Sequence, residues 1–248
     1  MQKVAIVTGS SRGIGKEIAL KLSAEGFAIV INYLSNKTAA EEVAKQIENA
    51  GGKTLIIKAD ISSKDESENL VEQTIKTFGR IDVLVNNAGI TRDNLLIRMS
   101  LEEWQAVLQT NFTGIMNLTE LVIDIMQRQE TGKIINLSST VGVHGNAGQA
   151  NYATAKSALL SYTKIKAREL MPKIQVNAIA PGLVQTDMTA NFDLEKLSKT
   201  KLGRAASPSD IAECVVWLVK PSGNYITGQI IEIDGGLFLW ADIEALAK

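Results

Sequence analysis

Short, unbroken apolar runs alternate along this chain with longer amphipathic stretches, and this alternation restricts the possible folds more than any other feature. The runs lie at residues 4–8, 28–33, 54–59, 81–85, 133–137, 174–180 and 230–233. Because the apolar residues in these runs are continuous rather than alternating, we expect strands buried on both faces. The stretches at about 13–25, 37–50, 64–78, 102–128, 150–171 and 208–219 are expected to be helices. This order predicts an α/β fold, a doubly wound, Rossmann-type parallel sheet of seven strands with helices on both faces.

No linker, internal repeat or low-complexity tract interrupts the pattern, so we expect residues 1–248 to form a single domain. Residues 183–207 have no clear period and follow a Pro-Gly turn, and a connection of this length predicts a substrate lid. The helical stretch 112–126 is apolar almost all round. One of its faces is expected to meet the sheet and the other a second subunit. The apolar tail at 237–240 suggests the same.

Composition excludes several classes of protein. A formal net charge of −1 argues against a general nucleic-acid binder. A single cysteine, Cys214, forms no internal disulfide, and with a single histidine, His144, we expect no metal site. His144 lies in a glycine-rich loop and is not expected to be catalytic. No apolar run approaches the roughly 18–20 residues that cross a bilayer, so no membrane partner is expected. The chain begins a strand without a leader, which favours a cytoplasmic location.

The first predicted strand runs into a glycine-rich turn, Gly9-Ser10-Ser11-Arg12-Gly13-Ile14-Gly15, which a helix follows. Glycines let the backbone approach a pyrophosphate closely, and the amino end of the helix offers N–H groups and partial positive charge. The spacing is Gly-x3-Gly-x-Gly rather than the dinucleotide fingerprint G-x-G-x-x-G, so a plain strand-to-helix turn is the alternative interpretation. The position after the first strand favours a dinucleotide site.

The choice of nicotinamide cofactor depends on residues 32–37. An NAD site places a carboxylate about 20 residues after the turn to hold the ribose 2′-hydroxyl. This window contains no carboxylate, whereas Arg12 and Lys37 could pair with a 2′-phosphate. The sequence therefore predicts NADPH/NADP+ rather than NADH.

Two further strand ends carry polar residues. Asp60, followed by Ile61, could accept a hydrogen bond from an adenine amino group, although a helix cap is the alternative. Asn87-Ala88-Gly89 closes the fourth strand with residues that permit close ring packing, and a simple turn explains them equally well.

Tyr152 and Lys156 are four residues apart in a predicted helix and therefore share a face. A phenol titrates near about pH 10, and a nearby cation lowers that pKa. The pair is expected to donate or accept a proton, and Ser139, after the fifth strand, to hydrogen-bond a substrate carbonyl. Ser138 is adjacent and could be confused with it. In isolation a solvated helix face explains the pair better. All these motifs, however, fall at the carboxyl ends of parallel strands. Because open α/β sheets bind ligands there, this position favours a ligand site.

With these motifs the sequence resembles short-chain dehydrogenases/reductases over essentially its whole length. The resemblance also rests on Asn86, on Asn111, on Pro181-Gly182 and on residues 226–229 leading to Asp234-Gly235-Gly236. It implies that Tyr152 is the general acid, that Lys156 binds the nicotinamide ribose and lowers the tyrosine pKa, and that Ser139 orients the carbonyl. Asn111 would hold a proton-relaying water. The expected nucleotide-binding residues are Gly9, Ser10, Ser11, Arg12, Gly13, Ile14, Gly15, Asp60, Ile61, Asn87, Ala88, Gly89, Tyr152, Lys156, Pro181, Gly182 and Val184.

Within that family, residues 89–99, 145–152 and Thr186-Asp187-Met188 are similar to members that act on acyl carrier protein. The similarity implies NADPH-dependent reduction of a 3-oxoacyl thioester on acyl carrier protein to the (3R)-3-hydroxyacyl thioester, in a homotetramer. An acidic carrier protein would dock on a basic spot beside the active-site mouth. The candidates are Arg128, Lys133 and Lys173, with Glu130 near the place where a basic residue is expected.

Two other functions are compatible with the sequence. The catalytic residues contact only the carbonyl and the cofactor, so a reductase or dehydrogenase of the same family acting on acetoacetyl-CoA, a sugar or another alcohol would share them. A non-catalytic NADPH-binding regulator would have no need of Ser139, Tyr152 and Lys156 together.

Overall fold

A computed structural model describes residues 2–186, 189 and 200–239 and confirms the predicted sheet. Seven parallel strands lie in the order β3-β2-β1-β4-β5-β6-β7, so the strand order reverses between β1 and β4. The strands are β1 (Val4–Val7), β2 (Ala28–Tyr33), β3 (Thr54–Lys58), β4 (Val83–Asn86), β5 (Gly132–Leu137), β6 (Ile174–Pro181) and β7 (Ile230–Ile233). In an open α/β sheet of this kind the carboxyl edge at the reversal is where ligands bind.

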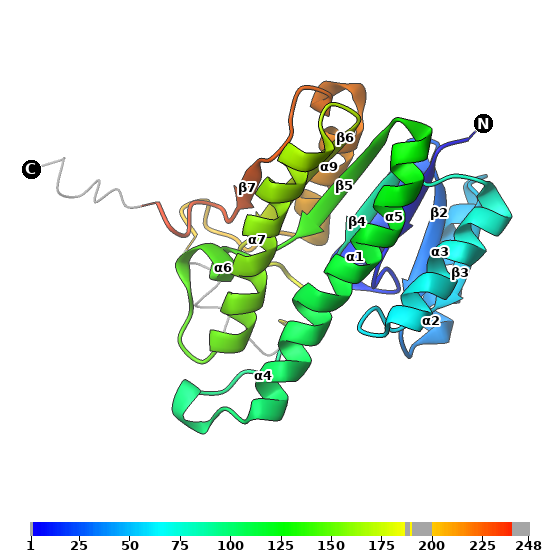
Figure 1. Cartoon of the computed structure of the whole chain (residues 1–248). Coiled ribbons are helices and arrows are strands. Elements are labelled where there is room, and N and C mark those ends of the chain that lie inside the picture. Colours follow the sequence, from blue (N-terminus) through cyan, green and yellow to red (C-terminus); the bar gives the residue numbers. More distant parts are fainter. Residues whose placement is uncertain (1, 187–188, 190–199, 240–248) are drawn as a thin grey trace, which may run out of the picture.

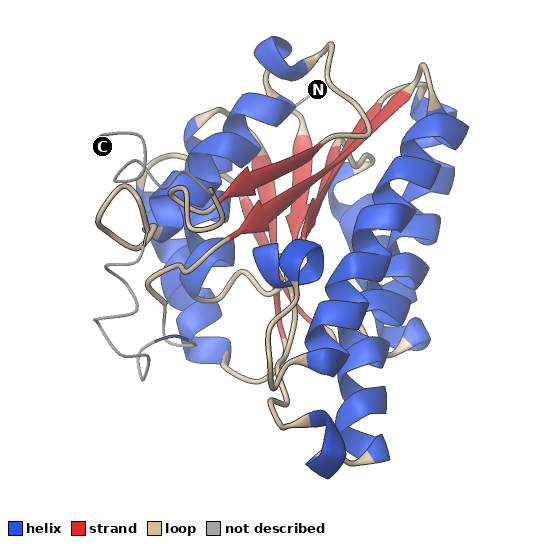
Figure 2. Ribbon diagram, turned by 90° about the vertical axis from the view of Figure 1, so that its left-hand side faces the viewer, coloured by secondary structure: helices blue, strands red, loops and turns tan. Residues whose placement is uncertain are grey.

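Helices cover both faces of the sheet, as Figure 2 shows. On one face α1 (Gly13–Ala24), α2 (Lys37–Asn49) and α9 (Pro208–Val219) enclose one apolar core. On the other, α3 (Lys64–Phe78), α5 (Ile115–Gln129) and α7 (Ala150–Leu170) enclose a second. Successive apolar side chains of the inner strands enter the two cores alternately, which is why these strands lack a polar face: all four residues of β1 are buried.

The stretch predicted as one helix over 102–128 is three consecutive helical segments instead. They are α4 (Leu101–Leu108), a π-helical segment (Gln109–Gly114) and α5, which Figure 1 shows as one long rod. At the π-helical segment Gln109 Nε2 donates to the Ser62 carbonyl at 2.9 Å. A Cβ at Gly114 would collide with the carbonyl of Ile61. The widened turn is therefore packed directly against the connection that follows β3, and a single-period pattern gave no sign of it.

Three short elements among the described residues were not predicted: α6 (Thr140–His144) and the 3₁₀ turns at Leu96–Arg98 and Pro221–Gly223. The all-round apolar stretch is buried or half-buried within the chain itself. The half-buried residues on the two flanks of its buried stripe, Phe112, Met116, Leu121 and Ile125, pack against the second core. The expected contact with another subunit remains a prediction.

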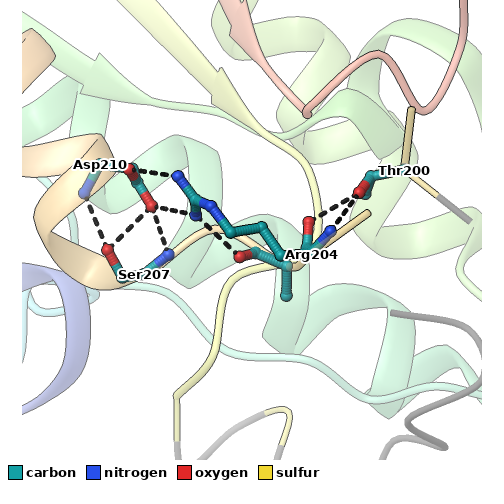
Figure 3. A network of polar contacts seen from close by, with 5 residues as sticks. Thr200, Arg204, Ser207 and Asp210 are labelled. Atoms are coloured by element: carbon teal, nitrogen blue, oxygen red, sulfur yellow. Dashed lines mark hydrogen bonds and ion pairs between the residues drawn. The ribbon is translucent and has the colours of Figure 1, made fainter. Parts of the chain in front are cut away.

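Both ends of the predicted lid, residues 183–207, are anchored. Val184 pairs with Ala206 in an isolated parallel bridge. Next to it, Arg204 forms two bonds to the Asp210 carboxylate, at 2.7 and 3.0 Å, and Thr200 Oγ1 donates to the Arg204 carbonyl (Figure 3). Asp187 and Met188 lie outside the described residues, as do residues 190–199 and Trp240. Among the helices that are described, none is long and apolar enough to cross a membrane.

Candidate active site

A cavity of about 450 Å³ opens at the carboxyl edge of the sheet. It gathers residues from the connections after β1, β2, β3, β4, β5 and β6 and from the first turns of α7. The predicted site residues that line it are Gly9, Ser11, Arg12, Gly13, Ile14, Asp60, Ile61, Asn87, Ala88, Gly89, Tyr152, Lys156 and Pro181. The structure thus brings together most of the residues predicted from the sequence.

Four predicted nucleotide-binding residues lie behind the lining rather than in it. Ser10 is fully buried, and its Oγ accepts a hydrogen bond from the backbone N–H of Asn32 at 3.2 Å. Gly182 N donates to the Ile233 carbonyl at 2.9 Å, and Val184 forms the bridge to Ala206. At Gly15 a Cβ would lie 2.5 Å from the Gly9 carbonyl oxygen. These residues support the cavity wall.

The glycine-rich turn presents an open helix end to the cavity. Gly9 and Gly13 have φ angles of 61° and 56°, a region that side chains disfavour, and this lets the chain reverse directly into α1. The N-cap residue of α1 is Arg12, whose side chain makes no capping hydrogen bond, and the first turn contains no acidic residue. The free N–H groups and the positive end of the helix dipole suit an anion such as a pyrophosphate.

Hydrogen bonds tie the ends of β1, β2 and β4 to one another. Thr8 Oγ1 accepts from the backbone N–H groups of Asn87, at 2.9 Å, and Ala88, at 3.0 Å. Asn87 Nδ2 returns a bond to the Thr8 carbonyl at 2.8 Å. Asn32 Oδ1 accepts from Gly9 N at 3.1 Å, and its Nδ2 donates to the Ala59 carbonyl at 2.9 Å. Asn32 and Asn87 therefore hold the glycine-rich turn in place. The alternative interpretation of Asn87-Ala88-Gly89 as a simple turn does not account for these bonds.

Of the two cations expected to pair with a 2′-phosphate, Arg12 and Lys37, only Arg12 lines the cavity. Arg12 lines the cavity together with residues 33–36, none of which is acidic. Lys37 does not line it; its ammonium is paired with Glu41 at 3.3 Å on the exposed face of α2. Asp60 does line the cavity, and its Oδ1 also accepts from Ser62 N at 2.9 Å and Ser62 Oγ at 2.7 Å. The cap of α3 is Ser63 instead, whose Oγ accepts from Glu66 N, so the capping interpretation of Asp60 is wrong, and its position agrees with the ligand interpretation.

Tyr152 and Lys156 lie on the same side of α7 and face the cavity. The Lys156 Nζ is 5.7 Å from the centre of the Tyr152 ring and donates to the Leu137 carbonyl at 2.7 Å. Ser138, which lines the cavity, donates through its Oγ to the Lys156 carbonyl at 2.9 Å. Ser139 caps α6 by accepting from Val141 N at 3.1 Å, and it lowers the pKa of the Tyr152 phenol. The neighbouring serines have separate tasks: Ser138 fixes α7, and Ser139 acts on the phenol.

The electrostatics of the pair are governed by burial. The pKa of Tyr152 is raised to about 12, first by burial and then by the Asp93 charge, while Ser139 lowers it. Burial also lowers the pKa of Lys156 to about 8. Removal from water is the largest cause of both shifts. The expected lowering of the phenol pKa by Lys156 remains a prediction.

Asn111 lies in the π-helical segment and is fully buried. Its Oδ1 accepts from Ile90 N and its Nδ2 donates to the Ile90 carbonyl, both at 2.8 Å. A Cβ at Gly89 would be 3.1 Å from Asn111 Oδ1 and 3.7 Å from Lys156 Nζ, so Asn111 is close to the lysine across Gly89. The adjacent Thr110 lines the cavity and was missed by the sequence analysis, because nothing in the helical period marks a widened turn.

The three basic docking candidates do not flank the cavity. Lys133 lies at the start of β5 and Lys173 immediately before β6, so both are at the amino edge of the sheet, opposite the site. Arg128 is in the last turn of α5, which returns to that edge. Lys133 Nζ donates to Asn224 Oδ1 at 2.7 Å, and Lys173 is paired with Glu130 at 2.7 Å. The prediction of a basic spot at the active-site mouth is wrong for these residues within one chain.

His144 is outside the catalytic group. Its Nε2 is 2.7 Å from Glu232 Oε2, and its ring stacks on Phe238 with centroids 3.9 Å apart. Within residues 2–186, 189 and 200–239 there is no group of three or more His, Cys, Asp or Glu side chains arranged to hold a metal ion.

Comparisons with known proteins point to one family. A family model described as short chain dehydrogenase matches residues 3–197. A 3-oxoacyl-acyl-carrier-protein reductase of Synechocystis is 45% identical over 241 residues, which cover 96% of this chain and 98% of that protein. Proteins of the same description from Staphylococcus epidermidis and Thermotoga maritima are 44% and 40% identical, again over 96% of this chain and over 100% and 98% of their own lengths.

Proposed function

This chain belongs to the short-chain dehydrogenase family, and from that membership we propose that it is an NADPH-dependent 3-oxoacyl-acyl-carrier-protein reductase of fatty-acid elongation. The observation that carries the proposal is that Tyr152 and Lys156 line the same cavity as the uncapped amino end of α1. An anion site and a proton donor therefore share one space, as hydride transfer to a carbonyl requires. The full-length similarity to the carrier-protein reductases favours a 3-oxoacyl thioester as the substrate.

The residues fit a dinucleotide, and NADPH, when bound, would supply the hydride. The turn from Gly9 to Gly15 would hold its pyrophosphate, and Arg12 the additional phosphate of the ribose. Asp60 and Ile61 border the part of the cavity suited to the adenine, and Pro181 the opposite end.

The reaction itself assigns one task to each catalytic residue. Ser139 donates a hydrogen bond to the substrate carbonyl oxygen and so orients it. The Tyr152 O–H gives its proton to that oxygen as negative charge develops there, which leaves a phenolate. The raised pKa of the phenol means that the proton is in place at neutral pH. Lys156 would bind the ribose and stabilise the phenolate, and Asn111, beside it, would hold the water that returns the proton.

One experiment tests substrate and cofactor together. NADPH and NADH are each supplied with acetoacetyl groups on acyl carrier protein and on CoA, and cofactor oxidation is followed. We expect the fastest turnover with NADPH and the carrier-protein substrate, with a preference of at least about tenfold for NADPH because Arg12 would pair with a charged phosphate. Comparable rates with CoA favour the broader reductase, equal use of NADH contradicts the cofactor assignment, and no turnover favours the NADPH-binding regulator.

The proposal extends to assembly and location. A homotetramer is supported by the half-buried apolar residues Phe112, Met116, Leu121 and Ile125, which other subunits would cover. The cytoplasmic location remains a prediction.

A further inference from the structure

Two buried asparagines from different elements hold the backbone that follows β4. Asn111, in the π-helical segment, bonds both the N–H and the carbonyl of Ile90 at 2.8 Å. Asn151, in the first turn of α7, donates through its Nδ2 to the Arg92 carbonyl at 2.9 Å. Both asparagines are fully buried. The proposed reaction gives a task to Asn111 but none to Asn151.

The side-chain amide of Asn151 joins α7 to two neighbouring segments. Besides the Arg92 carbonyl, its Nδ2 donates to the Glu103 carbonyl in α4 at 3.3 Å. Its Oδ1 accepts from the backbone N–H of Tyr152 at 2.7 Å. Moving any of these segments would leave polar groups of a buried side chain unpaired, which is costly. Asn151 therefore sets the position of the turn that carries Tyr152 relative to α4 and to the segment after β4.

The other bonds between the segment after β4 and the start of α7 lie nearer the surface. Gln149 Nε2 donates to Asp93 Oδ2 at 2.8 Å, and Asp93 is exposed. Asn94, whose N–H donates to the Gly148 carbonyl at 2.8 Å, is half-buried. Water can replace a bond at the surface, whereas it has no access to the fully buried amide of Asn151. The bonds of Asn151 are therefore those whose loss solvent cannot compensate.

The segment that Asn151 holds also borders the cavity. Gly89 and Ile90 line it together with Tyr152 and Lys156. A Cβ at Gly89 would be 3.7 Å from Lys156 Nζ, so the cavity side of α7 lies close to this backbone. The spacing between α7 and the segment thus decides where the phenol lies in the cavity. A misplacement of about 1 Å in a reacting group can lower a rate by about 100-fold.

We propose that Asn151 is a positioning residue: by joining the first turn of α7 to the backbone of Arg92 and Glu103, it holds the Tyr152 hydroxyl where it can give its proton to the substrate carbonyl. This inference rests on the proposed function, in which Tyr152 is the acid. Asn151 does not line the cavity. Its effect on the reaction therefore passes through Tyr152, and NADPH affinity should not depend on it.

The test pairs Asn151→Ala with Asn177→Ala, a control of the same residue type. Asn177, in β6, is also buried, and its amide joins two backbone groups, the Ile226 carbonyl at 2.9 Å and the Gln229 N–H at 3.0 Å. These bonds hold the connection that precedes β7 and include no residue of α7. Both variants should lower the midpoint of urea unfolding, since each leaves buried backbone groups unpaired.

Turnover of an acetoacetyl group on acyl carrier protein is expressed per NADPH-binding site, so that only folded molecules count. In Asn151→Ala we expect kcat per site to fall by about 10- to 100-fold, while the Kd for NADPH changes by less than about threefold. In Asn177→Ala kcat per site should stay within about threefold of wild type. Asn151→Ser leaves a smaller gap and keeps a neutral polar group, so its kcat should lie between those of wild type and Asn151→Ala. This second variant decides the question if the alanine variant does not fold.

The outcomes separate the inference from the function on which it rests. Equal kcat per site in Asn151→Ala and Asn177→Ala would mean that Asn151 has only a structural role and would overturn the inference. A loss of NADPH affinity as large as the loss of turnover would overturn it too.

If the wild-type protein turns over no substrate, the proposed function fails, and the position of the phenol is followed directly. Fluorine NMR of protein that contains fluorotyrosine gives one signal for each of the four tyrosines, and Tyr152→Phe assigns that of Tyr152. A shifted or broadened Tyr152 signal in Asn151→Ala, but not in Asn177→Ala, supports the positioning role. An unchanged signal overturns it.

Discussion

The two sides of the cavity are constructed in different ways. On the nucleotide side, buried polar side chains such as Asn32, at 2% exposure, join strand ends, and glycines permit backbone contacts that leave no room for a Cβ. On the proposed substrate side, in the segment after β4, the 3₁₀ turn leaves Ile97 92% exposed, and the contacts come from surface side chains, such as Gln149 with Asp93. The proposed nucleotide side is thus formed largely by backbone that buried side chains join, whereas the proposed substrate side is formed by exposed side chains that can change without disturbing the sheet.

The largest effect is expected from Tyr152→Phe, which should lower turnover without lowering NADPH affinity. Tyr152→Phe removes the proton donor and leaves the glycine-rich turn intact, so turnover should fall by about 10² to 10⁴-fold. NADPH affinity, measured by quenching or enhancement of cofactor fluorescence, should change by less than about threefold, because the phenol is not part of the anion site. Near-normal turnover in this variant would remove Tyr152 from its role as acid. A parallel loss of NADPH affinity would show that the two sides are not independent.

A smaller effect is expected from a methyl group on the nucleotide side. In Gly15→Ala the new Cβ would lie 2.5 Å from both the Gly9 carbonyl oxygen and Asn87 Nδ2, so the turn must shift. We expect a loss of about 1–3 kcal/mol in the free energy of unfolding and a clear loss of NADPH affinity.

Gly145→Ala is the matched control on the substrate side. No atom lies within 4 Å of its added Cβ, and only the φ of 78° is unfavourable. With a ψ of 164° this conformation is almost reserved for glycine, so the variant should cost about 1–3 kcal/mol and leave NADPH affinity unchanged. Equal losses of affinity in the two variants would contradict the distinction between the sides. Chemical denaturation and a cofactor titration measure both quantities.

The nucleotide side was largely predictable because its signals are local. The unbroken apolar strands β1 and β2 and the turn from Gly9 to Gly15 require no knowledge of distant residues, and the structure has them at the predicted places. What was missed depends on contacts between segments far apart in the chain. The widened turn around Asn111 is set by packing against Ile61 and Ser62, about fifty positions earlier. No periodicity within residues 102–128 can report such a contact.

The substrate side and the electrostatics were predicted less well for the same reason. Spacing places Lys156 one turn from Tyr152, but only the fold shows that its ammonium donates to the Leu137 carbonyl and that burial controls both pKa values. Likewise, Lys133 and Lys173 are plausible docking residues by sequence position. The direction of the strands places them at the edge of the sheet that faces away from the cavity.

The smallest expected effect is at Asp210, in the first turn of α9. Asp210 and Ser207 form a capping box at the amino end of the helix, and Arg204 adds two bonds to the carboxylate. These bonds hold the pKa of Asp210 well below its usual range, first through Arg204 and then through Ser207. A carboxyl whose folded pKa is depressed stabilises the fold above its unfolded pKa, and that contribution is lost as the pH falls toward the folded value.

Asp210→Asn should therefore cost about 1 kcal/mol at neutral pH, mainly by weakening the helix cap. The difference from wild type should shrink as the pH falls below about 4, where the wild-type carboxyl also begins to lose its advantage. Arg204→Gln removes only the exposed arginine of an ion pair that solvent screens, so it should lower the free energy of unfolding by less than Asp210→Asn does. Urea unfolding of the three proteins at neutral and acidic pH measures this. A difference between wild type and Asp210→Asn that stays constant with pH would show that the contribution is packing rather than charge. NADPH affinity should be unchanged in both variants, because the nucleotide side does not depend on this surface network.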